Sequence, residues 1–282
     1  MPTVDEKRRA FRDLHASGCF VMPNPWDVGS ARWLQHLGFP ALATTSAGAA
    51  FGLGLPDSDA AVGCEVALAH VAAVAAATDV PVNADFASGY ARAPEDVAAN
   101  VGRCLGAGIA GLSIEDATDD PAAPLLDFTL AVERVRAAAE AAGPKVVLTA
   151  RAECFLVGRP DLDETVRRLH AYADAGADCL FAPGLRTRDE IAAVVAAVAP
   201  KAVNVLVGAA SGFTVDELAG LGVRRLSVGS GLARTAWGGF VRAARALAGE
   251  GRFDAMADAT PHAELDAFFR ADLPHRPDRT PG

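Results

Sequence analysis

Three short apolar stretches of this chain end in charged residues that could do chemistry together. A short apolar run that ends in a charge is typical of a buried parallel strand that delivers a polar side chain to the rim of a sheet. Because neighbouring parallel strands end along one edge, we expect these charges to form a single site. They are Asp85 after residues 80–84, Glu115 and Asp116 after residues 111–114, and Arg151 and Glu153 after residues 146–150.

The carboxylates suggest a metal site. Asp85 and Glu115, together with water, would offer the hard oxygen ligands that suit Mg²⁺ or Mn²⁺. Mg²⁺ keeps several waters in proteins, so two carboxylates are enough to predict such a site. Two alternatives stay open. Asp85 could instead cap the helix that follows it, and Glu115 could be a buried partner of Arg151, with or without a metal.

Arg151 is the candidate anion-binding residue, because a guanidinium can hold a carboxylate or phosphoryl group through two hydrogen bonds. A purely structural ion pair between Arg151 and Glu153 is the alternative. Ser46, with the backbone amides of Ala47 and Gly48, could cradle a second carboxylate, unless this stretch is an ordinary loop.

Two further residues fall at the same predicted rim. Asn204 lies in a predicted strand over residues 202–207, and we expect it to contact the substrate. Cys154 directly follows Glu153, and it is either close to the substrate or a plain buried thiol.

The elements that must position these residues alternate strand and helix eight times, in units of roughly 25–40 residues, as in a (β/α)₈ barrel of the TIM type. In that fold the active site lies at the C-terminal ends of the strands. An open doubly wound sheet is the alternative. That fold usually has a glycine-rich motif after its first strand, but residues 24–26 here are Asn-Pro-Trp. The predicted strands are residues 19–23, 41–45, 80–85, 111–115, 145–151, 179–182, 202–207 and 225–228.

The alternation of strands and helices ends near residue 250, and a segment with a Pro/Arg-rich end follows. We therefore predict a barrel over residues 1–250 and a C-terminal helical tail over residues 251–282, with a helix at residues 263–269. Two adjacent phenylalanines, Phe268 and Phe269, are unfavourable when exposed to water, so we expect them to dock on the barrel or on another subunit. Residues 46–59 and 117–127 read as long loops.

Composition narrows the function. The net charge of −9 and the pI near 5.1 argue against a nucleic-acid partner, whose footprint is basic. They do not exclude an anionic substrate, because a local Arg and a Mg²⁺ ion can override the global field.

No run of about 18 uncharged apolar residues is present, so no membrane span is expected. Five scattered cysteines without a paired motif suggest reduced thiols and a cytoplasmic enzyme.

The chain resembles the isocitrate lyase/phosphoenolpyruvate mutase superfamily from about Phe20 to Leu247. Each motif is weak alone, but the set is specific when it occurs in this order and at these spacings. The motifs are Thr-Thr-Ser-Ala-Gly at 44–48, the loop at Asp57, Asn-Ala-Asp-Phe-Ala-Ser-Gly-Tyr at 83–90, Ser-Ile-Glu-Asp at 113–116, Thr-Ala-Arg-Ala-Glu at 149–153 and Val-Gly-Ser-Gly at 228–231.

The resemblance implies a (β/α)₈ barrel in a homo-oligomer, a dimer or tetramer, whose last helix is exchanged with a neighbour. It implies Mg²⁺ and a small α-keto or α-hydroxy carboxylate, in which a C–C or P–C bond is made or broken beside an enolate. Carried over by position, Asp85 would be the main metal ligand, with Glu115 near it or acting through water. Residues 46–48 would hold the substrate carboxylate, Arg151 would clamp the substrate, and Asp57 would lie on a mobile gating loop.

Two departures from the family pattern matter. The family has a second acid two residues after the Asp85 position, where this chain has Ala87. Lyase members carry a catalytic Cys in a basic loop after the Glu115 position, and here residues 117–124 hold neither Cys nor Lys. Cleavage of isocitrate or methylisocitrate is therefore not expected. An enzyme like oxaloacetate decarboxylase or another lyase is the leading prediction, a C–P bond enzyme of the phosphoenolpyruvate mutase type is the second, and a non-catalytic keto-acid-binding barrel is the third.

Overall fold

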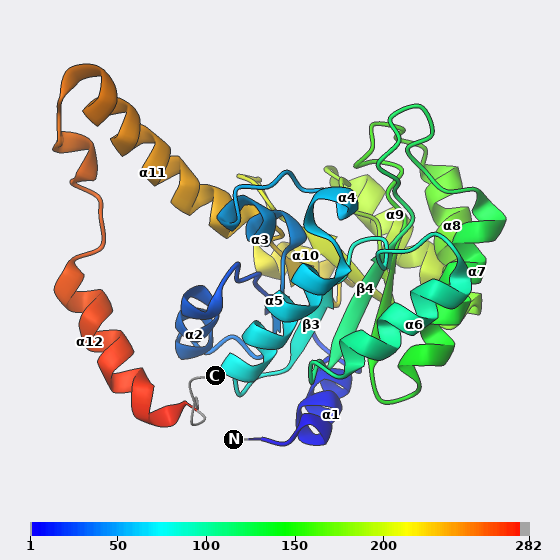
Figure 1. Cartoon of the computed structure of the whole chain (residues 1–282). Coiled ribbons are helices and arrows are strands. Elements are labelled where there is room, and N and C mark those ends of the chain that lie inside the picture. Colours follow the sequence, from blue (N-terminus) through cyan, green and yellow to red (C-terminus); the bar gives the residue numbers. More distant parts are fainter. Residues whose placement is uncertain (1, 277–282) are drawn as a thin grey trace.

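The computed structural model describes residues 2–276. Eight strands form one parallel sheet in the order β1-β8-β7-β6-β5-β4-β3-β2. The Ala43 amide donates to the Pro23 carbonyl at 3.1 Å and so links the two ends of the sheet. The predicted (β/α)₈ barrel is confirmed (Figure 1). The strands are β1 Phe20–Met22, β2 Leu42–Ala43, β3 Val82–Asp85, β4 Gly111–Glu115, β5 Val147–Arg151, β6 Cys179–Phe181, β7 Ala202–Leu206 and β8 Arg225–Ser227.

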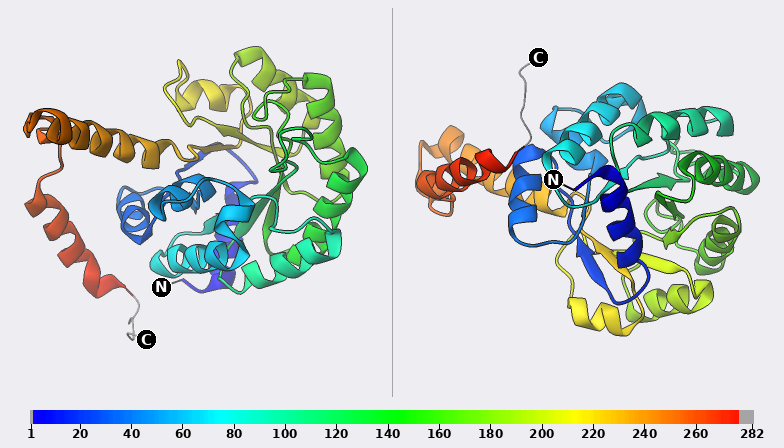
Figure 2. Two further views of the ribbon diagram at one scale, coloured as in Figure 1. Left: turned by 45° about the horizontal axis from the view of Figure 1, so that its top comes forward. Right: turned by 90° about the horizontal axis from the view of Figure 1, so that it is seen from below.

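Helices follow the strands and cover the outside of the sheet (Figures 1 and 2). Most of them begin where the alternation predicts. They are α1 Val4–Leu14, α2 Val28–His36, α3 Ser46–Gly52, α4 Asp59–Val62, α5 Cys64–Ala77, α6 Pro94–Leu105, α7 Phe128–Ala142, α8 Leu162–Asp174, α9 Arg188–Val198, α10 Val215–Gly220, α11 Gly231–Glu250 and α12 His262–Asp272.

Side-chain caps fix several of these helix starts. Asp27, predicted as an N-cap, accepts a hydrogen bond from the Ser30 amide at 2.7 Å. Thr214, also predicted as a cap, forms a capping box with Glu217.

The segment predicted as one loop over residues 46–59 contains two short helices. Thr45 caps α3 by accepting from the Gly48 amide, and small alanines continue the turn. The helix predicted to run from Ala60 is divided at Gly63, whose φ of +71° ends α4 before α5 begins. The glycine-rich composition hid these helices, because it favours a loop unless caps are considered.

A cluster of apolar side chains closes the N-terminal end of the barrel interior. Phe11 from α1 is fully buried there against Phe20 and Met22 of β1 and Val147 of β5. Helix α1 thus closes the bottom of the barrel with Phe11.

The last two helices depart from the barrel pattern. Helix α11 extends away from the barrel, and α12 returns toward α2 (Figures 1 and 2). Phe268 packs edge-on against Trp33 of α2, with ring centroids 4.6 Å apart, and Arg32 Nε donates to Asp272 at 2.9 Å. Phe268 therefore docks on the barrel's own helix α2. Across residues 2–276, no helix combines the length and the apolar character that a membrane span requires.

Candidate active site

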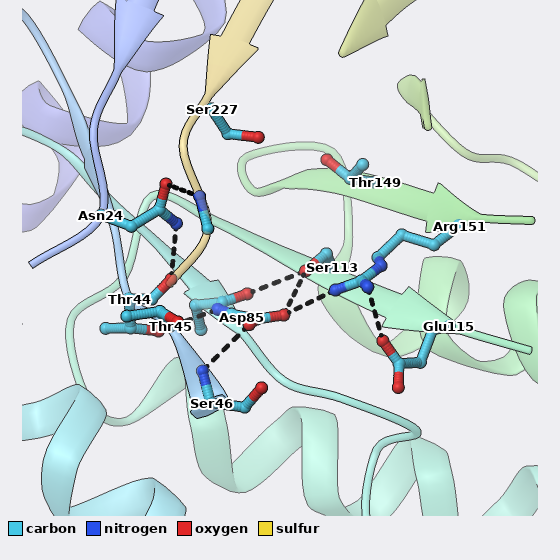
Figure 3. A network of polar contacts seen from close by, with 12 residues as sticks. Asn24, Thr44, Thr45, Ser46, Asp85, Ser113, Glu115, Thr149, Arg151 and Ser227 are labelled. Atoms are coloured by element: carbon cyan, nitrogen blue, oxygen red, sulfur yellow. Dashed lines mark hydrogen bonds and ion pairs between the residues drawn. The ribbon is translucent and has the colours of Figure 1, made fainter. Parts of the chain in front are cut away.

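Arg151 is the centre of a polar cluster at the C-terminal ends of β3, β4 and β5 (Figure 3). Its Nη1 donates to Asp85 Oδ1 at 2.9 Å, its Nη2 lies 2.9 Å from Glu115 Oε2, and its Nε donates to Glu153 Oε1 at 2.6 Å. The structure thus brings together the charges that end three separate strands. The ion pairs of Arg151 with Glu115 and with Glu153, each considered above as an alternative, are both present.

Asp85 is held by partners from three elements. Its Oδ2 accepts from the Ser46 amide at 3.0 Å, and the Ser113 hydroxyl lies 3.5 Å from Oδ1. The Asp85 amide in turn donates to the Thr44 hydroxyl at 2.9 Å. No contact makes Asp85 a cap for the following helix, α6, which starts from Ala93 without a side-chain cap. The carboxylate instead accepts from the first amide of α3 and lines the cavity.

The two acids that end β4 point to different sides, as successive residues of a strand must. Glu115 faces Arg151, whereas Asp116 is buried behind the barrel wall, where it accepts from Arg168 Nη1 at 3.0 Å and from the Tyr172 hydroxyl at 2.5 Å. Asp116 also accepts from the Glu153 amide at 2.8 Å. Asp116 is thus a structural anchor that fixes the segment carrying Glu153.

The cluster contains three acids around one arginine. Burial raises the pKa of Glu115 well above its ordinary value, even though Arg151 opposes the shift. Burial likewise raises the pKa of Glu153. Burial disfavours the charged form of Arg151, but Glu115, Glu153 and Asp85 outweigh it and hold its pKa well above the usual range. A site with this balance would gain from one more cation.

The predicted carboxylate cradle at residues 46–48 is largely engaged by the protein itself. The Ser46 amide donates to Asp85, and the Gly48 amide donates to the Thr45 hydroxyl at 3.2 Å. No hydrogen bond from the Ala47 amide appears within residues 2–276, and Ala47 lines the cavity. A Cβ at Gly48 would lie 2.6 Å from Thr45 Cγ2 and 2.9 Å from Trp26 Cβ, so this glycine is required by close packing.

Asp57 and Asn204, the remaining predicted site residues, also line the cavity. Asp57 lies in the segment between α3 and α4, where burial and the nearby Asp85 raise its pKa and the Ser46 side chain opposes that shift. Asn204 is fully buried, and its amide is bonded to Arg225 and to Ser227. It therefore lies beside the cavity with its amide engaged by these two neighbours. Cys154 is buried outside the cavity lining.

The cavity that these residues line has a volume of about 410 Å³. Sequence patterns alone missed several of its polar residues. Asp59 accepts a hydrogen bond from Ser88, next to Ala87, and burial raises its pKa. The sequence signal that could have pointed to Asp59 is its position directly after Ser58, the N-cap of α4. Other missed residues in the lining include Asp119, Arg225, Ser227 and Arg234.

The donor set suits a divalent metal ion in its chemistry. Within residues 2–276, no three His, Cys, Asp or Glu side chains converge as a metal-binding group by themselves. Mg²⁺ requires only one or two carboxylates and completes its shell with water and substrate oxygen. Asp85 and Glu115 provide such oxygens, and the excess of acids over Arg151 favours a bound cation. The residues present therefore fit Mg²⁺.

A closed (β/α)₈ barrel with an arginine among carboxylates at its C-terminal rim has the arrangement from which this fold builds its active sites. A family model described as phosphoenolpyruvate phosphomutase matches residues 11–248. The chain belongs to this family, within the isocitrate lyase/phosphoenolpyruvate mutase superfamily, and is a lyase or mutase-like enzyme. The resemblance predicted from the motifs is confirmed.

Three similar proteins illustrate the relationship. A candidate lyase/mutase from Burkholderia cenocepacia J2315 has a crystal structure that superimposes with a TM-score of 0.90, at 46% identity, covering 95% of this chain and 97% of that one. An uncharacterized protein of Mycobacterium tuberculosis H37Rv is 35% identical over 92% of this chain and 95% of its own length. The oxaloacetate decarboxylase of Bradyrhizobium diazoefficiens is 32% identical over 68% of this chain and 67% of its own length.

Proposed function

We propose that this protein is a Mg²⁺-dependent enzyme that cleaves a C–C bond of a small α-keto or α-hydroxy carboxylate through an enolate, as in decarboxylation of oxaloacetate. The observation that carries the proposal is the contact of Arg151 with Asp85, Glu115 and Glu153 in one cavity. The similarity to an oxaloacetate decarboxylase supports the substrate class.

Arg151 would bind the substrate. Its guanidinium has five N–H groups, and the three contacts with carboxylates leave two of them for a ligand. A carboxylate or keto oxygen placed there would carry more negative charge as the C–C bond breaks and the electron pair moves onto oxygen. Arg151 would therefore stabilise the enolate more than the substrate, which is the requirement for catalysis.

Glu115 is the candidate acid. Burial favours its protonated form by raising its pKa well above the ordinary value. After CO₂ leaves, the enolate carbon must take up a proton, and a protonated carboxyl beside Arg151 could supply it. Asp57, on the segment between α3 and α4, would cover the mouth of the cavity and exclude water during this step.

Asp85 would hold the Mg²⁺ ion, and Glu115 would lie near it or act through water, so that Glu115 can keep its proton. When bound, the ion would supply positive charge beside the oxygen on which the negative charge develops. Ala87 stands where the family has another acid, so the protein offers one carboxylate fewer to the ion and its water shell. We therefore expect binding of Mg²⁺ that is weaker than in members with the second acid.

A panel of substrates tests the proposal. Purified protein with Mg²⁺ would be incubated separately with oxaloacetate and with substituted malates, and release of pyruvate or another 2-keto acid would be followed. Turnover that stops when EDTA removes the metal is the expected result. Intact, folded protein that turns over none of them would contradict the proposal. Binding of keto acids without Mg²⁺ and without turnover would favour a non-catalytic binding barrel instead.

A second candidate reaction is C–P bond chemistry. The family model that matches the chain is described as a phosphoenolpyruvate phosphomutase, which favours this alternative. Residues 117–124, however, lack the Asn- and Lys-bearing loop of the mutase pattern. A ³¹P spectrum that shows no conversion of phosphonopyruvate or phosphoenolpyruvate would eliminate it.

We also propose that the protein acts as a cytoplasmic homo-oligomer, a dimer or tetramer, with residues 1–250 as the barrel and residues 251–282 as a tail. Helix α11 extends away from its own barrel and exposes Phe240 and Trp237, which supports exchange of this helix between subunits. The five free cysteines fit a reducing compartment. Light scattering of the purified protein would measure the oligomeric state, and a monomer would contradict the exchange.

A further inference from the structure

A chain of hydrogen bonds inside the barrel links β8 to β7 and back to β8. Arg225 Nε donates to Asn204 Oδ1 at 2.8 Å, and Asn204 Nδ2 donates to Ser227 Oγ at 2.9 Å. The register explains this arrangement, since Asn204 of β7 pairs directly with Arg225 of β8 and Ser227 lies two residues further along the same face.

Arg225 is an unusual residue to find at this depth. It is 1% exposed, and within residues 2–276 no carboxylate forms a salt bridge with it. Its other partners are neutral: Nη2 donates to the Thr149 hydroxyl at 2.9 Å, and Nη1 lies 3.3 Å from His15 Nε2. A buried guanidinium needs acceptors on all sides, and here each of them is an uncharged atom.

The charge of Arg225 determines which atom donates and which accepts in each of these hydrogen bonds. A guanidinium can only donate, so the Asn204 atom that faces it must be the carbonyl oxygen. The amide nitrogen of Asn204 then faces Ser227 and must donate to its oxygen. The Ser227 hydroxyl hydrogen is therefore not used toward Asn204, and within residues 2–276 it has no acceptor in the protein.

That hydrogen is available to a ligand. Ser227 is 6% exposed and lines the same cavity as Asp85 and Arg151. Its hydroxyl points away from β8, toward the side on which Thr149 and Arg151 lie (Figure 3). A ligand held by Arg151 would thus have a second donor, from the opposite part of the barrel.

We propose that Ser227 is a substrate-binding residue whose hydroxyl, oriented by Arg225 through Asn204, donates a hydrogen bond to an anionic oxygen of the bound substrate. The inference rests on the proposed function, because it assumes that the cavity takes a small carboxylate. It also assigns Asn204 and Arg225 as positioning residues, which act through Ser227.

Calorimetric titration with oxalate, a probe that resembles the enolate of pyruvate, tests this assignment in the presence of Mg²⁺. Ser227→Ala should weaken oxalate binding by about tenfold, as expected for loss of one hydrogen bond to a charged group. Ser227→Cys, which keeps the size but donates weakly, should also lose affinity. Ser211→Ala, an exposed serine outside the cavity, should bind like the wild type and serves as the control.

Asn204→Asp separates orientation from simple contact. An aspartate at this position would still accept from Arg225 but would also accept from Ser227, so the hydroxyl would turn away from the cavity. We expect Asn204→Asp to weaken oxalate binding in the wild-type background and to have little further effect in the Ser227→Ala background. An equal loss in both backgrounds would show charge repulsion by the new carboxylate and would overturn the orienting role of Asn204.

The outcomes also separate this inference from the proposed function. Oxalate binding by the wild type that is unchanged in folded Ser227→Ala and Ser227→Cys would overturn the role of Ser227 alone. Failure of the folded wild type to bind oxalate with Mg²⁺ would overturn the proposed function, and the role of Ser227 with it.

Discussion

Two arginines face the interior of the same barrel, and they differ in the charge of the groups around them. Arg151, at the rim, contacts three carboxylates and keeps 13% of its side chain exposed. Arg225, one layer deeper, is 1% exposed, and its contacts within residues 2–276 are all with neutral groups. The rim therefore has too little positive charge for its acids, whereas the deeper layer has a positive charge without an acid.

The difference separates two uses of a buried cation. At the rim, the surplus of carboxylates favours a metal ion and an anionic substrate as additional partners. In the deeper layer, the cation fixes which atoms of neutral side chains donate and which accept. One arginine thus takes part in binding, and the other orients the groups that bind. The following predictions test this distinction, from the largest expected effect to the smallest.

Arg151→Met should have the largest effect. Removing one partner of a buried ion pair typically costs about 3–5 kcal/mol, and here three carboxylates lose the same partner. We expect the free energy of unfolding to fall by about 3 kcal/mol, because the partly exposed acids can take up protons. Oxalate binding should become undetectable by calorimetry. Urea unfolding measures the first quantity, and Arg188→Met, at an exposed pair, is the matched control.

Arg225→Met should cost less stability than Arg151→Met. It leaves the acceptors on Asn204 and Thr149 unsatisfied but no carboxylate unpaired, which corresponds to about 1–3 kcal/mol. Affinity for oxalate should fall to the level of Ser227→Ala, because Asn204 is then free to turn. A larger loss of stability than in Arg151→Met, measured in the same urea titrations, would contradict the distinction between the two arginines.

Ala87→Asp should strengthen the rim's preference for a metal. Ala87 lines the cavity at the end of β3 and has a φ of +46°, a conformation that aspartate adopts more readily than most residues. An added carboxylate raises affinity for divalent cations, and we expect Mg²⁺ to bind about tenfold more tightly. Competition with Mn²⁺ followed by electron paramagnetic resonance measures this change. Unchanged or weaker metal binding would argue against a metal site beside Asp85.

The deeper layer should make the fold sensitive to acid. Burial, with the charge of Arg225, lowers the pKa of His15 to about 3. The unfolded chain takes up this proton below about pH 6.5, but the folded chain does not until about pH 3, so stability falls as pH drops between these values. His15 alone contributes a slope of at most about 1.4 kcal/mol per pH unit.

His15→Gln isolates that contribution, because Gln still accepts from Arg225 but does not titrate. The acid slope of the unfolding free energy, measured by urea titration from pH 6.5 to 4.5, should be smaller in His15→Gln than in the wild type. The raised pKa values of Glu115 and Glu153 act in the opposite direction and are common to both proteins. Equal slopes would show that His15 is protonated within the fold.

The sequence predicts the rim better than the deeper layer. Asp85, Glu115 and Arg151 each end an apolar run, so strand periodicity alone places them on one edge of the barrel. The hydrogen bonds that link Arg225 to Ser227 through Asn204 depend on the register between β7 and β8, which no local pattern specifies. Asn204 was predicted as a residue of the site, but its position between Arg225 and Ser227 becomes visible only in three dimensions.

The segment between β2 and α5 shows the other limit. Its alanines and glycines suit either a loop or a short helix, and the cap at Thr45 decides the outcome locally. The packing of Gly48 against Trp26 and Thr45 is a tertiary constraint that sequence composition does not contain. Such short elements at the mouth of a barrel are positioned by contacts rather than by their own propensity.

A crystal structure of the protein with Mg²⁺ and oxalate tests the central claim most directly. We predict a metal ion on Asp85, and oxalate bound to that ion and hydrogen-bonded to Arg151. Absence of metal density at Asp85, or oxalate bound away from Arg151, would contradict the proposed metal-dependent site for small keto acids.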